Sequence, residues 1–148
     1  MERALLLKKI DAQRAFFAAG KTRPVEARLK ALRALRDAIL AMEDEINAAL
    51  KADLGKSATE SYMCETGMVL SEISHMLKHA RRYSRPLRAR TPLAQFHASS
   101  RQLACPYGVA LVMSPWNYPL MLALDPAVDA IAAGNTVVLK PSAYAPRT

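Results

Sequence analysis

Residues 105–119, CPYGVALVMSPWNYP, and residues 134–142, GNTVVLKPS, decide the fold of this chain. The uninterrupted apolar run from Val109 to Met113 is typical of a strand buried in a parallel sheet. Residues 136–139 form a second such run, and a helical crossover separates the two. Two parallel strands joined by one helix make a βαβ unit, so the sequence predicts an α/β fold.

Polar residues follow both predicted strands. The first strand stops at Ser114-Pro115, and a proline-bounded turn then presents Trp116 and Asn117. The second strand ends on Lys140. Ligands of open α/β sheets bind outside the carboxyl ends of the strands, so we expect both strand ends to border a ligand site.

Three helices are predicted upstream of these strands. The first ends near Gly20, and the second runs from Pro24, at its first helical position, to a C-terminal cap at Gly55. The third begins between Ser57 and Glu60 and runs to about Tyr83. The second is expected to be one long helix with a single apolar stripe: Leu29, Leu32, Leu35, Ile39, Met42, Ile46, Leu50 and Leu54.

Proline residues divide the remaining segments. Residues 85–92 read as a connector. Residues 95–104 read as a strand that either crosses to another layer or forms part of a hairpin, with His97 on its surface. In the crossover between the buried strands, Pro126 does not suit a straight helix interior. We therefore expect a kink or a restart there, with Asp125 as the cap.

The formal net charge is +8, and the basic excess lies upstream of residue 105. No carboxylate occurs between Glu72 and Asp125, but seven basic residues do: Lys78, Arg81, Arg82, Arg85, Arg88, Arg90 and Arg101. This band suits either nucleic-acid phosphates or a surface that covers an acidic partner domain. We favour the second interpretation and expect no nucleic acid, because no aromatic residues or binding motif accompany the arginines.

Several other classes are disfavoured. Cys64 and Cys105 lack the spacing of a zinc site or a disulfide framework. His75 and His79 are spaced like a metal pair, but no third ligand accompanies them. Residues 103–124 are uncharged, yet prolines and a glycine interrupt them, so no membrane span is expected. A cytoplasmic protein is the prediction.

Two residues could carry chemistry. The amide of Asn117 suits an oxyanion hole, although an asparagine helix cap fits the same position. Lys140 suits ribose hydroxyls or a phosphate, although a solvated lysine also closes strands. No GxGxxG fingerprint follows either strand. On spacing alone, the structural interpretations are favoured.

The paired segments VMSPWNYP and AAGNTVVLKPS resemble the signature of the aldehyde dehydrogenase superfamily. Upstream, GKTRP at 20–24 and ADLGK at 52–56 resemble its class 3 branch, so the similarity spans the whole chain. The resemblance implies N-terminal helices plus the start of a parallel, Rossmann-like sheet that is incomplete here. It divides the chain into a helical part (1–90), a bridging, oligomer-forming strand (91–105) and the first βαβ of the cofactor-binding domain (106–148).

The resemblance also implies a reaction, the NAD(P)-dependent oxidation of an aldehyde to a carboxylic acid through a cysteine thiohemiacetal. Asn117 would donate to the oxyanion of that adduct, and Lys140 would bind the adenosine ribose of NAD or NADP. The implied cofactor-binding set is Met113, Ser114, Trp116, Lys140 and Ser142. Class 3 relatives are typically homodimers, so a homodimer is expected for the full-length form.

Three departures from the family pattern matter. Ala143 stands where many members carry a glutamate that holds the ribose hydroxyls, which makes NADP at least as plausible as NAD. Cys105 stands where a glutamate is common and does not match the position of the nucleophile. The family's nucleophilic cysteine and general-base glutamate lie beyond Thr148, so this chain alone is expected to be inactive. The alternative is a noncatalytic module that pairs with a full-length relative.

Overall fold

The computed structural model describes residues 3–148. The helices are α1 (Arg3–Ala18), α2 (Val25–Ala41), α3 (Glu43–Leu54), α4 (Ala58–Ser61), α5 (Gly67–Tyr83) and α6 (Met121–Ala133). A π-helical turn, Tyr62–Thr66, joins α4 to α5, and a 3₁₀ turn covers Leu93–Gln95. The strands are β1 (Leu87–Ala89), β2 (Ser100–Gln102), β3 (Val109–Met113) and β4 (Thr136–Lys140).

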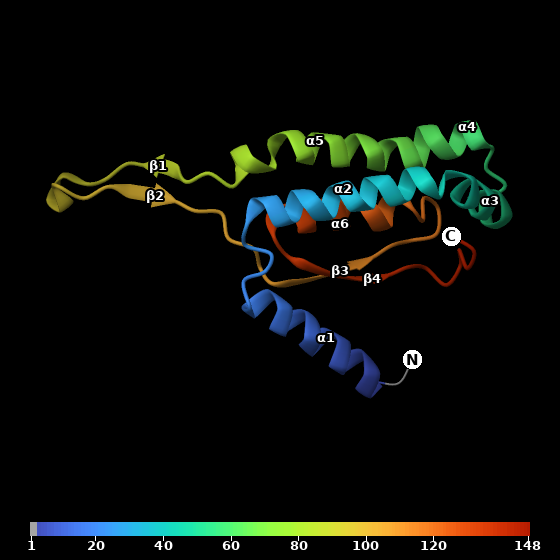
Figure 1. Ribbon diagram of the computed structural model, residues 1–148, viewed down its shortest axis with the longest axis horizontal. Helices are drawn as coiled ribbons and strands as arrows, with labels where there is room; N and C mark the ends of the chain where they lie inside the picture. Colours follow the sequence, from blue (N-terminus) through green and yellow to red (C-terminus); the bar gives the residue numbers. More distant parts are fainter. Residues whose placement is uncertain (1–2) are drawn as a thin grey trace.

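The predicted βαβ unit is confirmed. Strands β3 and β4 pair in parallel, with Val109 opposite Thr136 and Met113 opposite Lys140. Helix α6 connects them and packs on both strands (Figure 1). It ends as predicted at Gly134, which has a φ of 99°. A left-handed glycine is a common way to stop a helix and turn the chain into the next strand.

Strand β3 is less buried than its sequence predicts. Val112 is buried, whereas Leu111 is 61% and Met113 is 70% exposed. Successive side chains of a strand point to opposite faces of the sheet. One face lies under α6, and the other fronts an open hollow of about 540 Å³ beside α1, lined by Leu111 and Val138.

The core lies between α2, α5 and α6, which run side by side in Figure 1. Its buried members come from all three helices: Leu32, Ile39, Val69, Ile73, Val128 and Ala132. The apolar stripe predicted for the second helix therefore faces α5 and α6. Helix α6 also packs on β3 and β4, so it connects this core to the parallel sheet.

The prediction of one long helix from Pro24 to Leu54 is wrong. Pro24 has an extended backbone just before the helix. The helix ends before Met42, where φ is −104° and ψ is 15°. The next helix starts with Glu43, Asp44 and Glu45. Carboxylates in a first turn are favourable because they face the positive end of the helix dipole. The apolar periodicity of the sequence continues across Met42, so it gives no sign that the helix is interrupted there.

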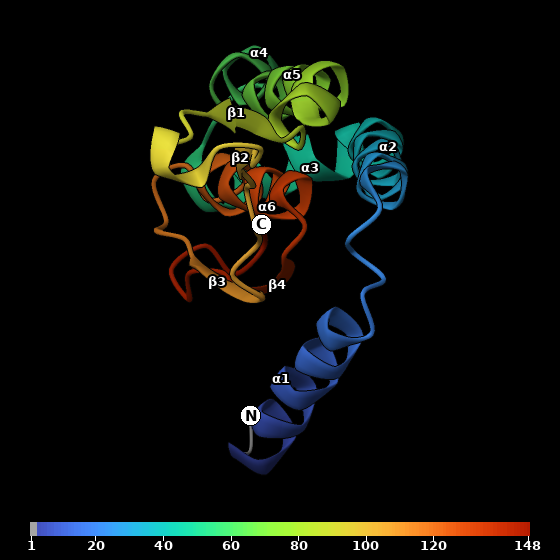
Figure 2. The same cartoon turned by 90° about the vertical axis from the view of Figure 1, so that its left-hand side faces the viewer.

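The predicted strand at 95–104 is also wrong over most of its length. Only Ser100–Gln102 is strand, and it pairs antiparallel with Leu87–Ala89, in a segment expected to be a connector. His97 lies in the turn with a φ of 77° rather than on a strand surface. Figure 1 shows the hairpin projecting beyond the end of α5, and in Figure 2 it points toward the viewer.

Helix α6 runs through Pro126, so the expected alternative of a restart with Asp125 as the cap is wrong. The helix instead begins at Met121, so Asp125 lies inside it rather than at a cap. Its Oδ1 atom is buried without a hydrogen-bond partner. Within residues 3–148, no helix has the length and apolar character that crossing a bilayer requires.

Candidate functional site

The structure brings the ends of the two parallel strands together. Met113 and Lys140 are register partners, and the Ser114 amide donates to the Lys140 carbonyl over 3.2 Å. The side chains of Met113 and Lys140 are exposed, whereas Ser114 is buried. Three of the residues expected to bind the cofactor therefore lie at one edge of the sheet.

Asn117 follows β3 in an exposed turn. Helix α6 starts four residues later, and its first amides are capped by another residue. The amides of Leu120 and Met121 donate to Oε2 of Glu65 over 2.8 and 3.2 Å. The interpretation of Asn117 as the helix cap is therefore wrong. Its side chain makes no hydrogen bond with the part of the chain that the structure describes.

Glu65 belongs to a buried ion pair that the sequence did not reveal. Its side chain is 0% exposed, and Oε1 accepts from Nζ of Lys56, whose side chain is 8% exposed. Nζ of Lys56 also donates to the backbone carbonyl of Asn117 over 3.1 Å. The ammonium lies 4.1 Å from the ring centroid of Tyr118, within the range of a cation–π contact. The ion pair thus contacts the turn at the backbone of Asn117 and at the ring of Tyr118.

The π-helical turn Tyr62–Thr66 places Glu65 in this position. A π-turn adds a residue to a helix and changes the direction of the side chains within it, and such turns often occur at functional sites. Gly67 permits it, since a Cβ there would lie 2.6 Å from the Tyr62 carbonyl oxygen. Glu65 and Gly67 form no recognisable sequence motif with Lys56, so only the tertiary structure reveals the ion pair between Lys56 and Glu65.

The segment after β4 folds back onto the turn. Trp116 contacts Tyr144 edge to face, with ring centroids 5.4 Å apart. The Tyr144 amide donates to Oγ of Ser142 over 3.1 Å. Further on, the Asp53 carboxylate accepts from the amides of Arg147 and Thr148. Burial raises the pKa of Asp53, but these hydrogen bonds outweigh it, so the pKa lies below its usual value.

The donors at this edge fit part of a nucleotide. Lys140 offers an exposed ammonium and Ser142 a hydroxyl, and Ala143 places no carboxylate beside them. Oγ of Ser114 is buried without a partner. Ammonium and hydroxyl groups suit ribose oxygens or a phosphate. For metals the donor set is poor: across residues 3–148, no group of three or more His, Cys, Asp or Glu side chains converges.

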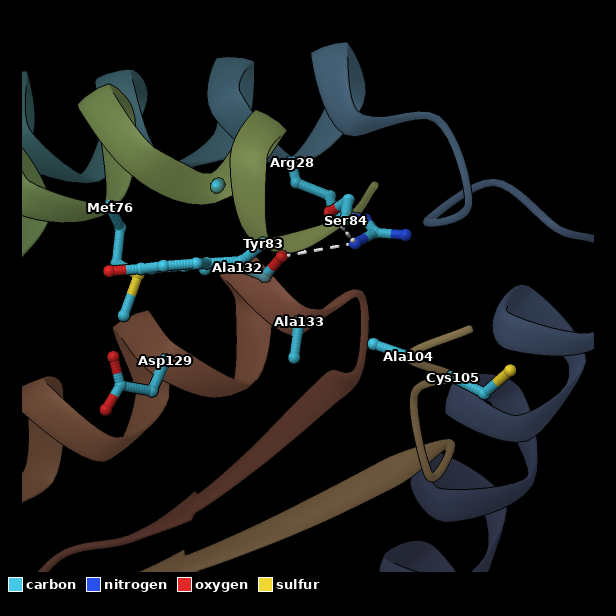
Figure 3. Close-up of a pocket in the computed structure, with 10 residues that line it drawn as sticks. Arg28, Met76, Tyr83, Ser84, Ala104, Cys105, Asp129, Ala132 and Ala133 are labelled. Carbon is cyan, nitrogen blue, oxygen red and sulfur yellow. Dashed lines mark hydrogen bonds between the residues drawn. The ribbon is translucent and has the colours of Figure 1, made fainter. Parts of the chain in front are cut away.

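A cavity of about 180 Å³ lies elsewhere, between α5, α6 and the approach to β3 (Figure 3). Arg28 crosses one side of it and donates through Nη1 to Oγ of Ser84 and to the Ala132 carbonyl. Burial lowers the pKa of Arg28. Cys105 lies on its rim, and none of the residues expected to bind the cofactor lines it. This cavity is separate from the strand-end site.

Comparison with known proteins identifies the family. The model of the Aldehyde dehydrogenase family matches residues 3–148. An aldehyde dehydrogenase of Craterostigma plantagineum is 42% identical over 139 residues, which cover 94% of this chain and 29% of the relative. Aldehyde dehydrogenase family 3 member H1 of Arabidopsis thaliana is 44% identical over 127 residues, covering 86% of this chain and 26% of the relative.

The structure agrees with these matches. The substrate-bound AldH of Staphylococcus aureus superposes with a TM-score of 0.93 at 36% identity, covering 96% of this chain and 31% of that protein. The chain thus spans about 30% of the length of such relatives and corresponds to the N-terminal part of their fold. The resemblance to the class 3 branch is confirmed by relatives named family 3. This chain belongs to the aldehyde dehydrogenase family, whose members are NAD- or NADP-dependent oxidoreductases.

Proposed function

We propose that this chain supplies the oxyanion donor and part of the cofactor cleft of an enzyme that oxidises an aldehyde to a carboxylic acid. Asn117 is the catalytic residue of the chain, and the cofactor contacts come from the strand ends: Met113, Ser114, Trp116, Lys140 and Ser142. The nucleophilic cysteine and the general-base glutamate come from outside these 148 residues.

The observation that carries the proposal is that other residues make the capping contacts at this turn, so the Asn117 side chain is not needed for them. Glu65 satisfies the first amides of α6, and Lys56 satisfies the backbone carbonyl of Asn117. The exposed Asn117 amide group therefore remains available to a substrate. When a thiolate adds to an aldehyde, the carbonyl oxygen becomes an anion, which a fixed N–H donor stabilises more strongly than it stabilises the neutral carbonyl.

Cofactor binding is the second contribution. NAD or NADP supplies the hydride acceptor for this oxidation. Lys140 binds the adenosine ribose through its ammonium, and Ser142 adds a hydroxyl at the same edge. Ala143 removes the carboxylate that would repel a 2′-phosphate, which makes NADP acceptable beside NAD.

The 148 residues alone are inactive under this proposal, because they hold one half of the oxyanion site and neither the nucleophile nor the base.

In the full-length form the projecting β1–β2 hairpin bridges two subunits of a homodimer. We expect a cytoplasmic location, a small-molecule aldehyde as substrate, and no nucleic-acid or membrane partner. The alternative is a noncatalytic module that pairs with a full-length relative through its helices and the projecting β1–β2 hairpin.

A chimera tests the proposal on the residues of this chain. Residues 3–148 replace the matching segment of the Staphylococcus aureus AldH, and NAD(P)H formation is followed with an aldehyde that AldH itself oxidises. Asn117→Ala is expected to lower kcat by about 10²–10³-fold, the loss typical of one oxyanion donor. A chimera without aldehyde-dependent turnover, or an Asn117→Ala variant with undiminished kcat, would contradict the proposal.

A further inference from the structure

One buried ion pair holds the chain from Asn117 to the start of α6. Lys56 donates to the Asn117 carbonyl and lies against the ring of Tyr118. Glu65 accepts from the amides of Leu120 and Met121, where the turn passes into the helix. These hydrogen bonds span 55 to 61 residues of sequence. The backbone of the turn is therefore held by residues far upstream in the sequence.

The pair is built to hold one geometry. Nζ of Lys56 has two oxygen partners, and the Glu65 carboxylate uses both of its oxygens, one on Lys56 and one on the two amides. Both side chains are almost wholly buried. Charged groups in a low-dielectric site bind their partners strongly, and a satisfied polar network specifies one arrangement of the chain. A shift of the turn would leave a buried charge without a partner, which is costly.

We propose that Lys56 and Glu65 are positioning residues for the oxyanion donor, acting on Asn117 through the backbone of its turn. This inference rests on the function proposed above. Glu65 takes over the capping of α6, so the Asn117 side chain is free to face the substrate. Lys56 fixes the position of the Asn117 carbonyl, which limits the directions that the side chain of this residue can take.

If the ion pair served only to stabilise the fold, apolar side chains could take its place. Apolar side chains of similar volume often replace a buried ion pair without loss of stability, so stability alone does not require these charges. The pair contacts polar backbone groups of the turn and is no member of the apolar core between α2, α5 and α6. An exposed pair, Arg81 with Glu26, provides a matched control far from the turn.

The first experiment uses the 148-residue chain, whose sole tryptophan, Trp116, lies next to Asn117. Acrylamide quenching of its fluorescence is measured for the wild type, Lys56→Met and the Arg81→Met control, with helicity followed by circular dichroism. Lys56→Met is expected to raise quenching toward that of the urea-unfolded chain while helicity is retained, and Arg81→Met is expected to leave both unchanged.

Further variants distinguish a loosened turn from global unfolding of the chain. Lys56→Met combined with Glu65→Leu leaves no unpaired buried charge, and it is still expected to loosen the turn. Glu65→Gln keeps an oxygen acceptor for the two amides, so it is expected to raise quenching less than Glu65→Leu. Quenching that is equal in the wild type and in the double variant would overturn the inference.

The second experiment is a double-mutant cycle in the chimera described above. Lys56→Met is expected to lower kcat by about 10²-fold, the cost of a misplaced catalytic group, and to change the KM for the cofactor by a smaller factor. In the Asn117→Ala background, the same change is expected to add less than about twofold, since both act through one donor. Losses that multiply would overturn this inference alone, whereas full activity of Asn117→Ala would overturn the proposed function itself.

Discussion

The guanidinium of Arg28 lies directly against the Cα of Gly134, so that a Cβ at this glycine would come within 2.7 Å of Cζ of Arg28. Gly134 ends α6 just before β4, and Arg28 ties α2 to the last turn of that helix through the Ala132 carbonyl. Arg28 therefore contacts the chain at the point where it turns from α6 into β4.

Gly134→Ala is therefore expected to destabilise the chain for two reasons, the φ of 99° and the clash with Arg28. A left-handed conformation alone costs a non-glycine residue about 1–2 kcal/mol. Gly55→Ala is the matched control, because its φ is 70° and a Cβ added there would have no atom within 4 Å. Urea unfolding should show a larger loss for Gly134→Ala, and equal losses would refute the role of Arg28.

Gly67→Ala should also destabilise the chain, although alanine is normally the better helix former by about 1 kcal/mol. The added Cβ would lie 2.6 Å from the Tyr62 carbonyl oxygen and would disrupt the π-turn that aims Glu65. Thermal unfolding followed by circular dichroism measures the loss. Met68→Ala, at an exposed position next in sequence, is the control. A gain of stability in Gly67→Ala would show that the π-turn is dispensable.

Asp125→Asn should stabilise the chain at neutral pH. Burial, and then the neighbouring Asp129, raise the pKa of Asp125 above its usual value. An acid whose pKa is raised by folding destabilises the native state where it is ionised, and this penalty disappears as pH falls below its unfolded pKa of about 3.9. After allowance for solvent screening, the gain at pH 7 should be less than about 1 kcal/mol.

Melting temperatures at pH 7 and pH 3.5 test this linkage. Asp125→Asn should melt higher than the wild type at pH 7 and nearly equal to it at pH 3.5. Asp11→Asn, at an exposed position, controls for the general effect of removing a negative charge. A larger gain at pH 3.5 than at pH 7 would reverse the sign of the argument.

Ala143→Glu should shift cofactor preference in the chimera toward NAD. A carboxylate beside the ribose accepts hydrogen bonds from its hydroxyls but repels a 2′-phosphate, and two such charges about 4 Å apart near a protein surface interact by roughly 1–4 kcal/mol. We expect kcat/KM for NADP to fall about tenfold or more relative to NAD. Ala143→Gln adds similar bulk without charge and should change the ratio little. An unchanged ratio in Ala143→Glu would remove residue 143 from the cofactor site.

Local sequence signals were sufficient for part of this structure. Apolar runs, proline and glycine predicted the parallel βαβ unit, the end of α6 at Gly134 and the end of α3 at Gly55. The break at Met42 was missed because the apolar stripe of the core continues across it. The strand Leu87–Ala89 was missed because three exposed residues give no periodic signal and depend on pairing with β2.

The candidate site shows the same division. The position of Asn117 after a buried strand could be read from the sequence, and so could that of Lys140. The sequence could not decide whether Asn117 is a helix cap. That answer depends on Glu65, which lies 55 positions upstream of Leu120, whose amide it accepts from, and on the π-turn that directs Glu65. Tertiary contacts of this kind leave no spacing pattern in a single sequence.

The most direct measurement of the central claim is the single-turnover rate of NAD(P)H formation in the chimera, with enzyme in excess over aldehyde. This rate isolates attack and hydride transfer from product release. If the Asn117 amide stabilises the oxyanion, Asn117→Ala should slow it by about 10²–10³-fold, whereas cofactor affinity should remain near that of the unmodified chimera. A single-turnover rate unaffected by Asn117→Ala would contradict the account.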